Sequence, residues 1–239
     1  MPTIEPYYSK KMTCPLCDTE FTTSRVRSRA AIPSVIDSDF CAHYKEKNVN
    51  PNYYAVNVCP ECGYAYTEEF SPNFPAGTKG ILEKKVSQNW EKRAYDGERD
   101  GMKAMATFKL AILSATLKKE KHVVMGNLCL RLAWIYRIEE ETDQEERFLR
   151  LAVEEFEKSY LDSDFTATSM SELRMLYMIG ELNRRLKDYQ KAITYFSKIV
   201  EHPKKSTEMK TVNMAREQWS LAMEEYRKLQ GQNQEEQDS

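Results

Sequence analysis

The alternation of apolar and polar residues changes its period near residue 80 of this 239-residue chain. Before that point, apolar residues alternate with polar ones in short runs at 21–26 and 53–58, which is typical of β-strands. A loop rich in proline and glycine covers 71–80, and beyond it apolar residues recur at the spacing of α-helices. The pattern predicts a mainly α fold in three parts: a small β module at 1–80, a helical domain at 81–229 and a polar, acidic, disordered tail at 230–239.

The helical part contains an internal repeat. Ala111, Ala152 and Ala192 lie 41 and 40 residues apart. Four residues after each alanine stands a core-type residue: Ala115, Phe156 and Phe196. Three residues before each alanine stands a larger residue: Phe108, Leu149 and Tyr189. A small residue between larger ones on one helix face predicts the place where a second helix approaches closely.

The last of these units resembles a tetratricopeptide repeat. The resemblance is carried by Leu176, Ile179-Gly180, Asp188-Tyr189, Ala192, Tyr195-Phe196 and Pro203. The middle unit, from Leu132 to Tyr160, is a looser match, and the first is looser still. The resemblance implies helix pairs stacked into an array, with the first helix of each pair lining a concave face. The residues that then map to this face, as candidates for partner binding, are Trp134, Arg137, Arg174, Tyr177, Glu181, Arg184 and Arg185.

Four of the six cysteines form two turns of the type Cys-Pro-x-Cys. In each turn the spacing lets two thiolates face one ion, and two turns together give the tetrahedral sulfur site that zinc favours. A redox pair needs only one such motif, in a strand–helix setting that is missing here. Four thiolates leave no open coordination position for catalysis. The sequence therefore predicts a zinc-ribbon-like module with one structural Zn²⁺ bound by Cys14, Cys17, Cys59 and Cys62.

Between the two turns, Asp37, Asp39, Cys41 and His43 occupy alternate positions. One interpretation is a second metal site, or a Cys41–His43 pair in a thiol- or metal-dependent enzyme or sensor. The other is that an aspartate caps a short helix through 44–47, with Cys41 packed beneath it. We favour the second, since residues two apart are poorly placed for a nucleophile and its base without a third, orienting group.

Charge argues against a general binder of nucleic acid. The chain has 35 basic and 37 acidic residues and a net charge of -2. Arg25, Arg27 and Arg29 alternate along an expected strand and keep a nucleic-acid-binding ribbon open as an alternative, but pairing with Glu20 or the aspartates at 37 and 39 accounts for them as well. No signal peptide and no apolar stretch of membrane-spanning length is present, which favours a reducing cytoplasm.

The order of parts resembles a bacterial family of unknown function with two such cysteine turns, an Asn-Pro-x-Tyr-Tyr segment and tetratricopeptide-like helices. The matching residues here are Cys14, Cys17, Asn50-Pro51-Asn52-Tyr53-Tyr54 and Cys59-Pro60-Glu61-Cys62-Gly63-Tyr64-Ala65. The resemblance implies a cytoplasmic location and this order of parts, but no activity. We therefore expect a non-enzymatic adaptor or scaffold that binds a protein or peptide, an acidic one in particular, on its concave face. The chain's own closing helix or tail is a competing occupant of that face.

Overall fold

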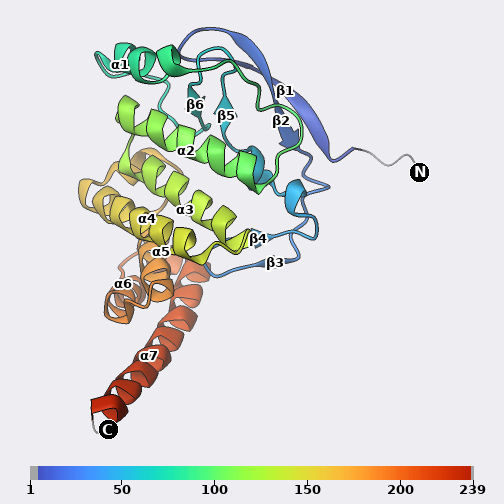
Figure 1. Ribbon diagram of the computed structural model, residues 1–239. Helices are drawn as coiled ribbons and strands as arrows, with labels where there is room; N and C mark the ends of the chain where they lie inside the picture. The colour runs from blue at the N-terminus through green and yellow to red at the C-terminus, as the bar shows by residue number, and fades with distance from the viewer. Residues whose placement is uncertain (1–4, 238–239) are drawn as a thin grey trace.

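The computed structural model describes residues 5–237 and shows a small β module beside a stack of helices (Figure 1). The β module contains three antiparallel hairpins of two strands each. The pairs are β1 (Tyr7–Thr13) with β2 (Glu20–Val26), β3 (Val35–Ile36) with β4 (Ala42–His43), and β5 (Asn57–Val58) with β6 (Ala65–Tyr66). The first expected strand is confirmed by β2. The second is confirmed only at β5, because Pro51 and the Asn50 cap turn Pro51–Tyr54 into a 3₁₀ helix.

Helices and the loops between them make up the rest of the described chain, which confirms the mainly α fold with a small β module at its start. The α-helices are α1 (Thr78–Lys85), α2 (Gly101–Lys118), α3 (His122–Ile138), α4 (Thr142–Asp162), α5 (Glu172–Arg185), α6 (Tyr189–Glu201) and α7 (Met209–Gln237). Further 3₁₀ helices lie at Lys47–Val49, Ser87–Asn89, Asp164–Ala167 and Lys205–Thr207. No helix within the described residues is long and apolar enough to cross a membrane.

The long helices pack in sequence order down the molecule (Figure 1). Helices α3 and α4 are joined by residues 139–141, and α5 and α6 by residues 186–188. Connections this short make each pair an antiparallel hairpin. Helix α2 packs on α3, α4 packs on α5, and α7 closes the series against α5 and α6. Figure 1 shows the distal part of α7 projecting away from the body.

The three repeated alanines lie on alternate helices, α2, α4 and α6, and all are fully buried. Two glycines also lie where a neighbouring helix approaches closely. A Cβ on Gly126 would come within 2.5 Å of the Phe156 ring, and one on Gly180 within 2.8 Å of the Phe196 ring. The same contact, glycine against phenylalanine, therefore occurs in both helix pairs.

Changing Gly180 to alanine is expected to lower the free energy of unfolding by about 1–3 kcal/mol, because Phe196 has to move. The better helix propensity of alanine, worth up to about 1 kcal/mol, offsets only part of this cost. Chemical denaturation measures the difference. The control is Gly80→Ala in α1, where nothing lies within 4 Å of the added Cβ and stability should rise. Equal stability of the two variants would contradict the close approach.

The β module and the helices share one hydrophobic core, in which Tyr53 and Tyr54 pack with residues of α2 and α3. Arg99, only 1% exposed, joins the two parts. Its guanidinium donates to the carbonyl oxygens of Tyr53 (3.2 Å) and Val56 (2.9 Å), and its backbone N–H donates to the Tyr54 hydroxyl (2.9 Å). Burial lowers the pKa of Arg99 to about 10. Nothing in the local sequence distinguishes this arginine from a surface residue.

The last helix runs into the segment that the sequence predicts as a tail. Residues 230–237 continue the backbone of α7, and disorder from 230 stays a prediction. Glutamine and glutamate are good helix formers, and the stretch contains no proline. The helix begun at Met209 therefore propagates through them. Residues 238 and 239 of the expected tail lie outside the described residues.

Candidate metal centre and concave-face cavity

The four predicted cysteines meet in one cluster. The Cys14 and Cys62 sulfurs are 3.6 Å apart, and those of Cys17 and Cys59 are 3.7 Å apart. These separations exceed a disulfide bond, and they match the ~3.8 Å edge of a tetrahedron with metal–sulfur distances of about 2.3 Å. The arrangement could hold a metal ion such as zinc.

The two cysteine turns have the same backbone geometry. In each, the residue after the second cysteine adopts a left-handed conformation, at Asp18 (φ 58°) and Gly63 (φ 72°). Its backbone N–H donates to the carbonyl of the first cysteine, at 2.9 Å from Asp18 and 3.0 Å from Gly63. Two equal turns facing each other place two sulfurs from each side around a common centre.

Apolar side chains from both parts of the chain enclose the cluster. Leu16, Phe21 and Tyr64 pack against it from the β module, and Leu82 packs against it from α1. Trp90 covers the second turn and donates its indole N–H to the Pro60 carbonyl at 2.9 Å. Three of the four cysteines are buried, and Cys17 is the exposed one.

The thiols of this cluster shift one another's ionisation. Hydrogen bonds from Cys14 and Cys62 lower the pKa of the Cys59 thiol because they stabilise its thiolate. The hydrogen bond with Cys59 raises the pKa of the Cys14 thiol, and hydrogen bonds with Cys14 and Cys59 raise the pKa of the Cys62 thiol. Several thiolates are stable this close together only with a cation between them.

The segment between the cysteine turns forms the β3–β4 hairpin, so the predicted capped helix through 44–47 is wrong. Phe40, with φ at 70°, reverses the chain, and the Asp37 N–H donates to the Cys41 carbonyl at 2.8 Å. Pairing of β3 with β4 satisfies backbone groups that a helix would have satisfied otherwise. The prediction that Cys41 is packed inside is confirmed. Burial raises the pKa of its thiol to about 12, which leaves it neutral and unactivated as a nucleophile.

Both aspartates of the hairpin bind Arg137 on α3. The Arg137 guanidinium donates to Asp37 at 2.7 Å, to both oxygens of Asp39 at 3.0 and 2.8 Å, and to Glu145 at 2.7 Å. Trp134, one turn earlier on α3, donates its indole N–H to Asp39 at 3.1 Å. Asp39 is fully buried. The carboxylates thus act neither as helix caps nor as surface charges, since they attach the hairpin to α3.

Helix α5 holds the hairpin from the other side. The Tyr177 hydroxyl donates to the Ser38 carbonyl at 2.8 Å, and the Ser38 hydroxyl donates to Glu181 at 2.6 Å. Arg185 binds Glu181 at 2.9 Å and Asp39 at 3.3 Å. Arg184 binds Glu181 and, at 3.1 Å, Glu225 of α7. Six of the seven residues predicted for partner binding therefore contact the chain's own hairpin or closing helix: Trp134, Arg137, Tyr177, Glu181, Arg184 and Arg185.

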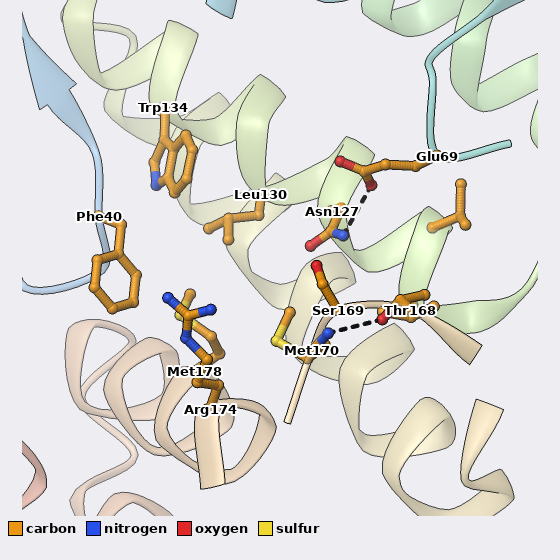
Figure 2. A pocket seen from close by; sticks show the side chains of 12 residues that line it. Phe40, Glu69, Asn127, Leu130, Trp134, Thr168, Ser169, Met170, Arg174 and Met178 are labelled. Carbon is orange, nitrogen blue, oxygen red and sulfur yellow. Dashed lines mark hydrogen bonds between the residues drawn. The ribbon is translucent and has the colours of Figure 1, made fainter. Parts of the chain in front are cut away.

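Arg174, the seventh predicted residue, lines a cavity of about 280 Å³ together with Trp134 (Figure 2). Its walls come from α3, from α5, from the segment before α5 and from Phe40 of the hairpin. The apolar lining includes Phe40, Val123, Val124, Leu130, Trp134, Met170 and Met178. Figure 2 shows the Arg174 side chain turned toward this space. Sequence reasoning missed the apolar lining, because its members come from three segments far apart in the chain.

The arginines at 25, 27 and 29 do not pair with the carboxylates suggested from sequence. Arg25 donates to the Tyr54 carbonyl at 2.6 Å and to the Asn57 side chain at 2.7 Å. Arg27 donates to the Glu5 carbonyl at 3.2 Å. The guanidinium of Arg25 thus satisfies polar groups of the 3₁₀ segment and of β5, which a strand register alone does not reveal.

Fold and site together define a mainly α protein whose small β module closes around a four-cysteine cluster. The chain belongs to an uncharacterised protein family conserved in bacteria, DUF2225, whose model matches residues 7–222. No match was found among curated proteins or among solved structures.

Proposed function

We propose that this protein is a non-enzymatic adaptor in which zinc stabilises the β module and the helical array binds a protein segment at the cavity beside Arg174. The observation that carries the proposal is the cavity itself, with apolar walls and a cationic side chain directed toward it. Within the described residues, the Arg174 guanidinium has no ion-pair or hydrogen-bond partner. An unpaired guanidinium beside an apolar space suits a ligand with a carboxylate next to an apolar group.

Zinc as the ion at the four-cysteine cluster rests on ligand chemistry. Four thiolates in tetrahedral arrangement are the usual ligands of structural zinc and leave no coordination position for a substrate. The enclosing apolar side chains shield three of the four cysteines from water, and Cys17 is the exposed one. We therefore assign the cluster a role in folding, and the cavity a role in binding.

The tetratricopeptide-like character of the array is part of this proposal. It is supported by two successive antiparallel pairs, α3–α4 and α5–α6, with the same glycine–phenylalanine contact in each. The first helices of these pairs, α3 and α5, carry Trp134 and Arg174 on one shared face. Repeat arrays commonly bind extended segments on such a face.

The size of the cavity favours a side chain over a cofactor. Pockets for small molecules span roughly 300–1,000 Å³, and this cavity lies just below that range at about 280 Å³. It accommodates an apolar anchor such as leucine or phenylalanine. Glu69 lies at the other side of the lining, bonded to Asn127 at 2.9 Å, so the acidic group of the ligand is expected on the Arg174 side.

The test uses fluorescent peptides with one leucine or phenylalanine anchor flanked by glutamates, and matched peptides flanked by lysines. Fluorescence anisotropy should show tighter binding of the acidic peptide, with Arg174→Glu weakening it by about three- to tenfold and improving the basic one. Met178→Asp should weaken both, because it places a charge in the apolar wall.

The control is Arg216→Glu, which makes the same charge change on an exposed position of α7 outside the cavity. It should retain the preference of the wild type. Equal affinity for acidic and basic peptides in both wild type and Arg174→Glu would contradict the proposed role of Arg174. Unchanged binding in Met178→Asp would place the peptide elsewhere.

A further inference from the structure

A second group of metal-ligating side chains lies on the β3–β4 hairpin, apart from the four-cysteine cluster. The ligand atoms of Asp37, Cys41 and His43 all lie within 4.8 Å of one another. We propose that this group binds a divalent transition-metal ion of the zinc class, which fastens the hairpin to the face formed by α3 and α5.

The hairpin brings the three side chains together by its backbone geometry. Asp37 and Cys41 bracket the turn, and the next register pair along the hairpin is Ile36 with Ala42, followed by Val35 with His43. The His43 Nε2 atom lies 3.0 Å from Asp37 Oδ2. That distance is close to the ~3.3 Å edge of a tetrahedron with zinc–nitrogen and zinc–oxygen distances of about 2.0 Å. An ion can therefore bind with small shifts of the side chains.

The negative charge around the hairpin favours the binding of a cation. One connected ion-pair network holds the carboxylates Asp37, Asp39, Glu145, Glu181 and Glu225. The guanidiniums in the same network are Arg137, Arg184 and Arg185. Five negative groups against three positive ones leave an excess of two negative charges. Metal binding releases the Cys41 proton and so adds a third negative charge, and a divalent ion offsets two of these three.

The chemical types of the three ligands determine which class of metal ion is preferred. Imidazole nitrogen, thiolate sulfur and carboxylate oxygen form a mixed set that suits zinc and its neighbours better than magnesium or calcium. Cys41 gives up its thiol proton to solvent when the ion binds, since only the thiolate coordinates. The His43 side chain is 35% exposed, so an ion reaches the group from solvent.

Groups beyond the three ligands hold them in place. Arg137 binds Asp37 at 2.7 Å, and Asp39 accepts from the Cys41 N–H at 3.4 Å and from Trp134 at 3.1 Å. Hydrogen bonds of this kind orient carboxylate and backbone groups around metal ions. The same contacts connect the ligand group to Trp134, which lines the cavity.

The experiment counts zinc ions per chain in the full-length protein after loading with Zn²⁺ and gel filtration. Wild type should hold two, one at each cluster, and both His43→Ala and Cys41→Ser should hold one. Circular dichroism checks that the variants are folded. The matched control is His122→Ala, which removes a histidine that also lies beside two carboxylates, Glu155 and Asp162, and should leave two.

A wild-type value of one ion overturns the proposal even if the variants fail to fold, and so does retention of two ions in His43→Ala. Loss of an ion in His122→Ala instead would place the second ion at the surface group formed by His122, Glu155 and Asp162. Titration with Co²⁺ gives a second measurement in the wild type. The second equivalent should add a thiolate-to-cobalt band much weaker than that of the first, because one thiolate replaces four, and this band should be missing in Cys41→Ser.

Discussion

Replacing Cys59 with serine should remove the metal ion of the four-cysteine cluster and unfold the β module. Structural zinc binds with an apparent free energy of about 10–16 kcal/mol, which equals or exceeds the ~5–15 kcal/mol stability of an ordinary domain. Without the ion, the thiols around Cys59 are left buried and crowded. Only a few apolar residues, among them Leu16, Phe21 and Tyr64, then remain to hold the two cysteine turns together.

The effect should extend into the helices. Tyr53, Tyr54 and Val58 lie between the hairpins and belong to the same core as α2 and α3. We expect the Cys59→Ser protein, and wild type treated with a strong chelator, to be cleaved rapidly within residues 5–66 in limited proteolysis and to unfold at lower temperature.

The control for this prediction is Cys129→Ala, which removes a buried thiol from α3 far from the cluster in sequence. It should keep its full metal content and lose only about 1 kcal/mol, as for other small core truncations. A Cys59→Ser protein with the metal content and protease resistance of the wild type would show that the cluster is not a metal centre.

The second large effect is expected from Arg137→Met. The change leaves Asp37, Asp39 and Glu145 without their shared guanidinium, and Asp39 is fully buried. Removing one partner from a buried ion pair costs about 3–5 kcal/mol when the remaining charge is uncompensated, and here Arg185, 3.3 Å from Asp39, compensates only part of the charge left by Arg137. We expect a loss of this size in denaturant unfolding, together with exposure of Trp134, which hydrogen-bonds to Asp39.

The control is Arg150→Met on α4, whose ion pair with Glu146 is more than half exposed on both sides. It should change stability by no more than about 0.5 kcal/mol. A loss below about 1 kcal/mol for Arg137→Met would mean that the hairpin is not fastened through this arginine.

Lowering the pH should weaken the contact between Asp37 and Arg137. Burial by itself would raise the pKa of Asp37, but the hydrogen bonds from His43 and Arg137 outweigh it and hold that pKa below its ordinary value. A carboxyl whose pKa is depressed by folding contributes stability above its unfolded pKa of about 4 and loses it as the pH falls toward the folded value. The wild type should therefore lose stability below about pH 4, and Arg137→Met should lose less over that range.

Sequence reasoning identified the features that depend on short spacing. The Cys-Pro-x-Cys turns have the geometry expected of them, because four consecutive residues suffice to define a turn. The repeated alanines at 111, 152 and 192 are buried as expected, since residues three and four apart share a helix face. In both cases the pattern and the contact lie within one element.

The interpretation of residues 37–43 failed because their partners are far away in the chain. A carboxylate near a loop is compatible with a helix cap, and only the packing of α3 shows that Asp39 binds Arg137, 98 residues later. The apolar lining of the cavity was missed for the same reason, since Phe40, Trp134 and Met178 lie in separate elements.

The sequence by itself therefore determined the helix faces, the two equal cysteine turns and the mainly α composition, because backbone sterics and helical periodicity act over a few residues. Tertiary structure decided that the β3–β4 hairpin lies across α3 and α5, that Arg99 joins the β module to the helices, and that Arg174 faces an apolar cavity. These contacts form between residues separated by 40 to more than 130 positions, where no local preference specifies which charges and apolar groups meet.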